Sequence, residues 1–235
     1  MSQPKEEPSF YEIIKKIILF PFDKMIINTL PELGHLAPVI FTVGTAFISL
    51  ISLNYPLGIF AASGVEALFI SSALQTVSSF LFKPSLDVFN PTGNVCKSYF
   101  QSITPSRFRY LLGTGVRNEF PNLPIFFLAF ACAYSIQSMF YYSEEISNLG
   151  PQYSSRPYLA IIASALILFI YSAYLLVYSC DTLFSILFSV LLGGLVGFLI
   201  TTQNNLLFGK ESVNLLFIPT LARRTGMDYI CVTKG

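Results

Sequence analysis

A short stretch near the C-terminus has the residue types of a phosphate site. The sequence GKES at positions 209–212 resembles the end of a phosphate-binding loop, in which a lysine follows a glycine. That loop also needs a glycine five residues earlier and a hydroxyl residue directly after the lysine. Asn204 and Glu211 occupy these two positions, so the sequence argues against a nucleotide site and instead predicts a docking segment. The candidate docking residues are Lys210, Arg223 and Arg224.

One acidic residue lies within a long apolar run. Glu66 shares the run 57–82 with Gln75, and a carboxyl group inside a membrane usually faces a bundle interior or an aqueous cavity. Glu66 could therefore be a proton or cation site in a small channel or transporter. The alternative is a packing contact, in which a protonated Glu66 pairs with Gln75 or with a serine of a neighbouring span. The sequence lacks the paired carboxylates and repeated halves of many transporters, which favours the packing contact.

The remaining chemistry-bearing residues are isolated. Asp181 lies between two apolar runs and is predicted to be the N-cap of the second of them. The single histidine, His35, and four widely spaced cysteines give too few ligands for a metal centre. Because no nucleophile, base and acid share a motif, we expect a non-enzymatic protein with no cofactor. The cysteines are Cys96, Cys132, Cys180 and Cys231.

The composition is that of a membrane protein. Apolar residues make up 53% of the 235 residues and charged residues only 11%, with a mean hydropathy of +0.62. Soluble domains carry about 25% charged residues, so most of this surface does not face water. The net charge of +1 gives no field that would attract nucleic acid. The expected partner is therefore the lipid bilayer, and no small-molecule substrate is evident.

The apolar runs predict an all-α, multi-pass transmembrane bundle of about five spans. Four spans are the alternative, and the proline-flanked run 121–142 is then the one that does not cross. Gly193, Gly194 and Gly197 are predicted to let a neighbouring helix approach closely. The last two runs are expected to form a tight antiparallel hairpin. The predicted spans are 36–53, 57–82, 121–142, 158–178 and 182–200.

Three regions follow from these runs. Residues 1–35 form a polar, interfacial segment, 36–200 the transmembrane domain with a polar basic loop at 83–120, and 201–235 an extramembrane docking tail. Within 9–31, apolar and charged residues alternate at helical spacing until Pro21, which predicts an amphipathic helix on the membrane surface or, alternatively, against a partner helix. The loop 83–121 and the N-terminal region hold nine of the 14 Lys and Arg residues, so these regions are expected to be cytoplasmic and the tail to lie on the other side.

Four segments of running sequence carry a resemblance. RNEFPNLPIFFLAFACAY (117–134), LGPQYSSRPYLA (149–160), CDTLFSILFSVLLGGLVGFLI (180–200) and NNLLFGKESVNLLFIPTLARRTGMDYIC (204–231) resemble a multi-pass membrane protein of nucleocytoplasmic large DNA viruses. The resemblance implies a structural protein of the virion inner membrane, or of a host-derived internal membrane, that links the bilayer to capsid proteins. It brings no catalytic residues. A small channel or transporter using Glu66 and an accessory subunit of an organellar membrane complex remain the alternatives.

Overall fold

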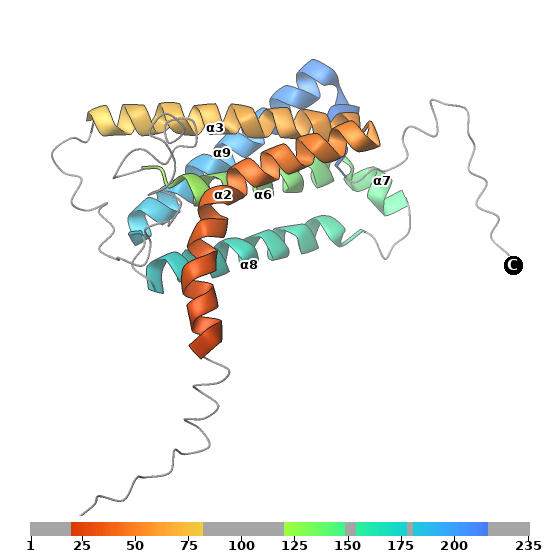
Figure 1. Cartoon of the computed structure of the whole chain (residues 1–235). Helices are drawn as coiled ribbons and strands as arrows, with labels where there is room; N and C mark the ends of the chain where they lie inside the picture. The colour runs from red at the N-terminus through yellow and green to blue at the C-terminus, as the bar shows by residue number, and fades with distance from the viewer. Residues whose placement is uncertain (1–19, 82–119, 149–153, 178–180, 216–235) are drawn as a thin grey trace, which may run out of the picture.

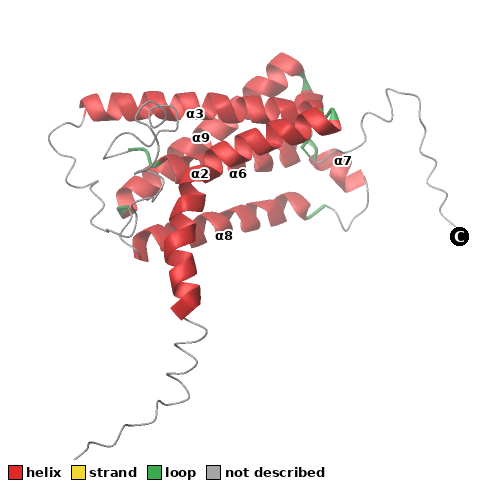
Figure 2. Ribbon diagram, in the orientation of Figure 1, coloured by secondary structure: helices red, strands yellow, loops and turns green. Residues whose placement is uncertain are grey.

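The protein is helical throughout the residues that the structure describes. The structure is a computed structural model that describes residues 20–81, 120–148, 154–177 and 181–215, and every regular element within these ranges is a helix (Figure 2). The predicted all-α fold is therefore confirmed for this part of the chain. The helices are α2 (Phe20–Ser52), α3 (Tyr55–Leu81), α6 (Leu123–Tyr141), α7 (Ser143–Asn148), α8 (Arg156–Val177), α9 (Leu183–Phe208) and the 3₁₀ helix η5 (Lys210–Val213).

Four helical segments are long and apolar enough to cross a membrane, which indicates an integral membrane protein. They are Tyr55–Ser78, Leu123–Tyr141, Arg156–Val177 and Leu183–Phe208. The first predicted span corresponds to a shorter apolar segment, Leu36–Ser52. The four-span alternative leaves out the run 121–142, but this run corresponds to Leu123–Tyr141, one of the four longer segments. The short segment is the first one, Leu36–Ser52.

Helix α2 differs from the sequence-based boundaries. Pro21, which was expected to interrupt the amphipathic helix, lies in the first turn of α2, where a proline leaves no intrahelical donor unsatisfied. The helix then continues through the predicted boundary between 35 and 36. Figure 1 shows that α2 bends sharply along its length. The bend is explained by Pro31 and Pro38, each of which removes a backbone hydrogen bond inside the helix. The amphipathic pattern of residues 9–19 lies outside the described residues.

Contacts between the helices define two ends of the bundle. At one end, the loop end, Gln75 of α3 contacts Pro121 just before α6, and Asp181 just before α9 contacts Asn122. The opposite, tail end holds α7 and η5. Helices α6 and α9 run in parallel from the loop end to the tail end. Helices α3 and α8 run the opposite way, because Tyr174 near the end of α8 packs at the loop end. The chain therefore alternates in direction from α3 to α9 (Figure 1).

The closest packing joins α6 and α9 through two glycines. A Cβ atom on Gly193 would lie 2.2 Å from the backbone oxygen of Phe126, and one on Gly197 would lie 2.6 Å from that of Phe130. Only glycine lets two helix backbones approach so closely. The prediction of close approach is confirmed for these two glycines. The third, Gly194, has nothing within 4 Å of the same position, so it has no role in this contact.

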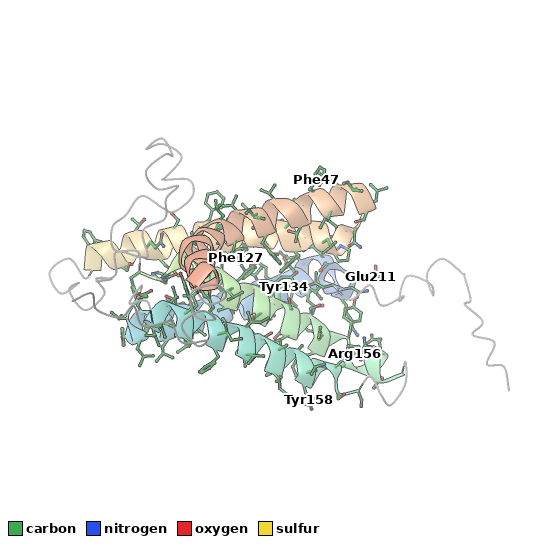
Figure 3. The ribbon with its side chains drawn as sticks, turned by 60° about the horizontal axis from the view of Figure 1, so that its bottom comes forward. Phe47, Phe127, Tyr134, Arg156, Tyr158 and Glu211 are labelled. Carbon is green, nitrogen blue, oxygen red and sulfur yellow. The ribbon has the colours of Figure 1, made fainter. Side chains whose placement is uncertain are left out.

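Helix α6 lies at the centre and α8 at the edge of the bundle. Phe126, Phe130 and Tyr134 of α6 are completely buried and pack with Phe60 of α3. Figure 3 shows Tyr134 between the helices and Tyr158 of α8 on the outside. Most of α8 is exposed, and it packs mainly on α6. The last two spans are therefore antiparallel, but the predicted tight hairpin is wrong, because α8 and α9 each pack mainly on α6 and hardly on each other.

Helix α9 ends eight residues beyond the predicted span. The sequence-based boundary was 200, where the apolar run gives way to polar residues, but the helix ends at Phe208. Gly209 then adopts a positive φ of 81° and its N–H donates to the carbonyl of Asn205. A positive φ favours glycine. Gly209 of the apparent phosphate loop is therefore the C-cap of α9, and residues 201–208 belong to the bundle rather than to a tail.

Candidate functional site

A buried group of polar residues lies near the tail end, and we name Ser63, Tyr134, Asn204 and Ser212 the inner polar cluster. The Asn204 side-chain amide donates to Ser63 Oγ at 2.7 Å and to the Tyr134 hydroxyl at 3.1 Å. The Ser212 hydroxyl donates to the Asn204 carbonyl at 3.0 Å. All four residues are at most 4% exposed. The cluster joins α3, α6, α9 and η5 by hydrogen bonds between their own side chains and backbone.

Sequence reasoning did not identify Asn204 as a packing residue, although a signal was present. Gly193, Gly197, Thr201 and Asn204 follow one another at spacings of four, four and three residues. Such spacings place residues on one face of a helix, and all four are buried. A polar residue in line with two contact glycines is therefore predicted to bond across the helix interface.

A second polar contact lies on the outside of the same helices. Glu66 of α3 and Gln203 of α9 form the outer polar pair, in which Gln203 Nε2 donates to Glu66 Oε1 at 3.4 Å. Gln75, the partner considered from the sequence, instead donates to the carbonyl of Pro121 at 3.0 Å. The reason is geometric, since nine residues are two and a half helical turns and place Glu66 and Gln75 on opposite faces of α3.

At the loop end, a set of polar contacts that we name the cap link joins the starts of α6 and α9. The N-cap of α9 is Thr182, which accepts from the Ser185 N–H, so the prediction that Asp181 is this N-cap is wrong. Asp181 lies one residue earlier and accepts from the Thr182 N–H and from the Asn122 side chain, both at 2.8 Å. Asn122 in turn is the N-cap of α6, and its N–H donates to Ser189 Oγ at 2.8 Å.

Burial changes the pKa of Asp181. Burial raises the pKa of this carboxyl above its ordinary value of 3.8, and hydrogen bonds from Asn122, Ser185 and the Thr182 N–H offset part of that rise. Burial disfavours the charged form and outweighs these hydrogen bonds, which stabilise it. No catalytic acid or base is needed to explain its environment.

At the tail end, Tyr142, Glu145 and Lys210 form a set that we name the tail clamp. The Lys210 ammonium donates to Glu145 and lies 4.7 Å from the centre of the Tyr142 ring, while the Tyr142 hydroxyl donates to the Lys210 carbonyl at 2.6 Å. The hydrogen bond from Lys210 lowers the pKa of Glu145 below its ordinary value of 4.5. Close by, Ser138 donates to the carbonyl of Val213.

The tail clamp contains one of the three predicted docking residues. Lys210 was a candidate for docking on a partner or on the chain's own membrane domain, and it engages α7 of its own chain. Tyr142, which follows the last residue of α6, is buried in the same set of contacts. Arg223 and Arg224, the other docking candidates, lie outside the described residues.

The structure does not bring the predicted site residues together. Glu66, Gln75, Asp181 and Lys210 lie in four separate contacts, and each bonds a protein group from another element. These hydrogen bonds and the ion pair hold the helices at fixed positions. Comparisons with protein-family models, with curated proteins and with solved structures find no match to this chain. The resemblance to membrane proteins of large DNA viruses thus stays a prediction, and the function is argued from the residues.

Proposed function

We propose that this chain is a non-enzymatic structural protein of the inner membrane of a large DNA virus particle, where it anchors the capsid shell to the bilayer. One observation carries the structural role. Each predicted site residue within the described part of the chain is used in a contact between helices or between a helix and the tail. A site for chemistry would need several of these groups around one reacting atom.

The alternation of helix directions supports five passes. Helix α6 has 19 residues, which corresponds to about 28 Å of helix and matches a hydrocarbon layer of about 30 Å. The apolar part of α2, Leu36–Ser52, runs beside α3 and ends at the tail end. Its 17 residues are at the lower limit for a span. With five passes, the loop between α3 and α6 and the tail after η5 lie on opposite sides.

The first part of α2 supports an interfacial segment. Figure 1 shows it running across the direction of the other helices, near the loop end. In a bilayer that contains the bundle, a helix in this direction lies along the membrane surface. The segment would then present the N-terminal region on the same side as the basic loop 83–120. Both would be available to a shell of proteins on that side.

The channel alternative is less well supported by the position of Glu66. A conducting path would place this carboxyl on a line of water through the bundle, whereas Glu66 lies in the outer polar pair with the exposed Gln203. The centre of the bundle is filled by the rings of Phe60, Phe130 and Tyr134. We therefore place the structural role first.

Fractionation of purified particles tests the proposal. The chain should copurify with virions, stay with the membrane in high salt and leave it in detergent, and it should cross-link to a capsid protein in intact particles. Detection only in cellular membranes, with none in purified particles, would overturn the viral role. Recovery in an organellar complex of an uninfected cell would favour the accessory-subunit alternative instead.

A further inference from the structure

The outer polar pair lies deep in the predicted membrane layer. Tyr134 lies seven residues before the end of α6 at Tyr141, which places the inner polar cluster about 10 Å from that end of the helix. Glu66 follows Ser63, the α3 residue of the cluster, by almost one turn towards the loop end. Because α6 has about the length of the hydrocarbon layer, the Glu66–Gln203 contact lies within that layer and not at its surface.

This pair also faces outwards. Gln203 is exposed, and on the same side of α3 the neighbouring side chains of Val65 and Phe69 are 44% and 71% exposed. Among the described residues, the second carboxyl oxygen of Glu66 and the carbonyl oxygen and second N–H of Gln203 have no hydrogen-bond partner. Ionisable residues within a membrane normally face protein or water because exposure to lipid is unfavourable. A protein surface is therefore expected to cover this pair.

The opposite side of the bundle has no such feature. Along the middle of α8, the exposed side chains are all apolar, with Leu166 57% and Phe169 71% exposed. Figure 1 places α8 and α3 on opposite sides of the bundle. Lipid chains satisfy an apolar surface of this kind, so the α8 side needs no partner. The requirement for a cover is specific to the side that carries Glu66 and Gln203.

We propose that a second copy of this chain covers the outer polar pair, so that Glu66 and Gln203 of one copy bond Gln203 and Glu66 of the other around a two-fold axis. A two-fold contact uses the same patch twice, and this patch carries both a carboxyl acceptor and an amide donor within one contact. The exposed ring of Phe69, one turn from Glu66, supplies apolar area beside the bonds. The inference requires only that the bundle spans a membrane and does not depend on the viral role.

Energy transfer between labelled copies in phosphatidylcholine vesicles tests the hydrogen bonds. The unmodified full chain should associate, and Glu66→Leu and Gln203→Leu should each weaken association about tenfold, since each change removes two bonds per dimer. Glu66→Gln should retain association because its side chain still accepts. Thr202→Val is the matched control, because the Thr202 hydroxyl donates to the Phe198 carbonyl of its own helix. Thermal unfolding in detergent verifies that every variant folds.

Cross-linking tests the surface itself. In a chain whose four natural cysteines are replaced by serine, Phe69→Cys should form disulfide-linked dimers in the membrane. Phe169→Cys, equally exposed on α8, should not. A monomeric unmodified chain at all protein-to-lipid ratios, equal association of Glu66→Leu and Thr202→Val, or equal cross-linking from both cysteines would overturn the inference. Association in vesicles by a chain that is absent from particles would support it while refuting the viral role.

Discussion

At the loop end, α6 and α9 are joined through a buried carboxyl, Asp181, that bonds an uncharged amide, whereas at the tail end Glu145 bonds the ammonium of Lys210 near the surface. The two acidic residues respond in opposite directions, since the pKa of Asp181 is raised by burial and that of Glu145 is lowered by its cation. Two carboxyl groups thus stabilise the two ends through different interactions. The loop end depends on desolvated hydrogen bonds between caps, and the tail end combines a buried amide with an exposed ion pair.

The largest expected loss of stability comes from the α6–α9 contact, because these two helices connect the loop end with the tail end. Gly193→Leu would force a side chain into the backbone of α6, where a Cβ atom already lies 2.2 Å from the Phe126 oxygen. We expect a loss of about 3 kcal/mol or more of unfolding free energy, measured by circular dichroism in detergent. Gly194→Leu is the control, because nothing lies within 4 Å of its Cβ position. Equal stability of the two variants would contradict the α6–α9 packing.

The second largest loss of stability should be confined to the tail end. Asn204→Leu leaves Ser63 and the Tyr134 hydroxyl without their donor in a buried site, and we expect a loss of about 2 kcal/mol. Hydrogen exchange should rise in η5 and the last turns of α9 but not at the start of α6. Asn205→Leu, one position along on a half-buried site, provides the comparison. A uniform rise along the whole bundle would show that the two ends are not separate units.

The loop end should lose stability as the pH rises. The folded-state pKa of Asp181 is raised above its ordinary value of 3.8, so its contribution is fully present below that value and is lost as the pH rises through the raised pKa. Asp181→Asn should remove this part of the pH dependence of thermal unfolding. If the variant keeps the slope of the unmodified chain, the titration belongs to another group.

The tail clamp should show a smaller effect of the opposite sign. The lowered pKa of Glu145 means that its contribution is present above the ordinary value of 4.5 and is lost as the pH falls through the lowered pKa. Because the Lys210 and Glu145 side chains are 43% and 28% exposed, Lys210→Met should cost about 0.5 kcal/mol or less. A high-salt titration should weaken this contribution and leave that of Asp181 in place.

The sequence predicted the helical spans well because a long apolar run is a local property. Four of the five runs correspond to helices that are long and apolar enough to cross. The end of α9 was missed because hydropathy falls at the polar residues from Thr201 onwards, although Asn204 is buried and bonded in the bundle. A hydropathy pattern cannot distinguish a polar residue that leaves the membrane from one that bonds a neighbouring helix.

The partners of the site residues were harder to predict because they are distant in sequence. Asp181 bonds a residue 59 positions away and Glu66 one 137 positions away. Charge and spacing along one helix identify that such a residue needs a partner but not which helix supplies it. The sequence also does not show that Thr182 rather than Asp181 is the N-cap, since both residue types cap helices.

Cysteine labelling across a sealed membrane tests most directly the claim that the two ends lie on opposite sides. Cys96 lies between α3 and α6, and Cys231 follows η5, so single-cysteine chains can report each end separately. With Cys132 and Cys180 replaced by serine, the account predicts that an impermeant maleimide labels Cys96 and Cys231 from opposite faces. Labelling of both from the same face would contradict five passes and the separation of the loop end from the tail end.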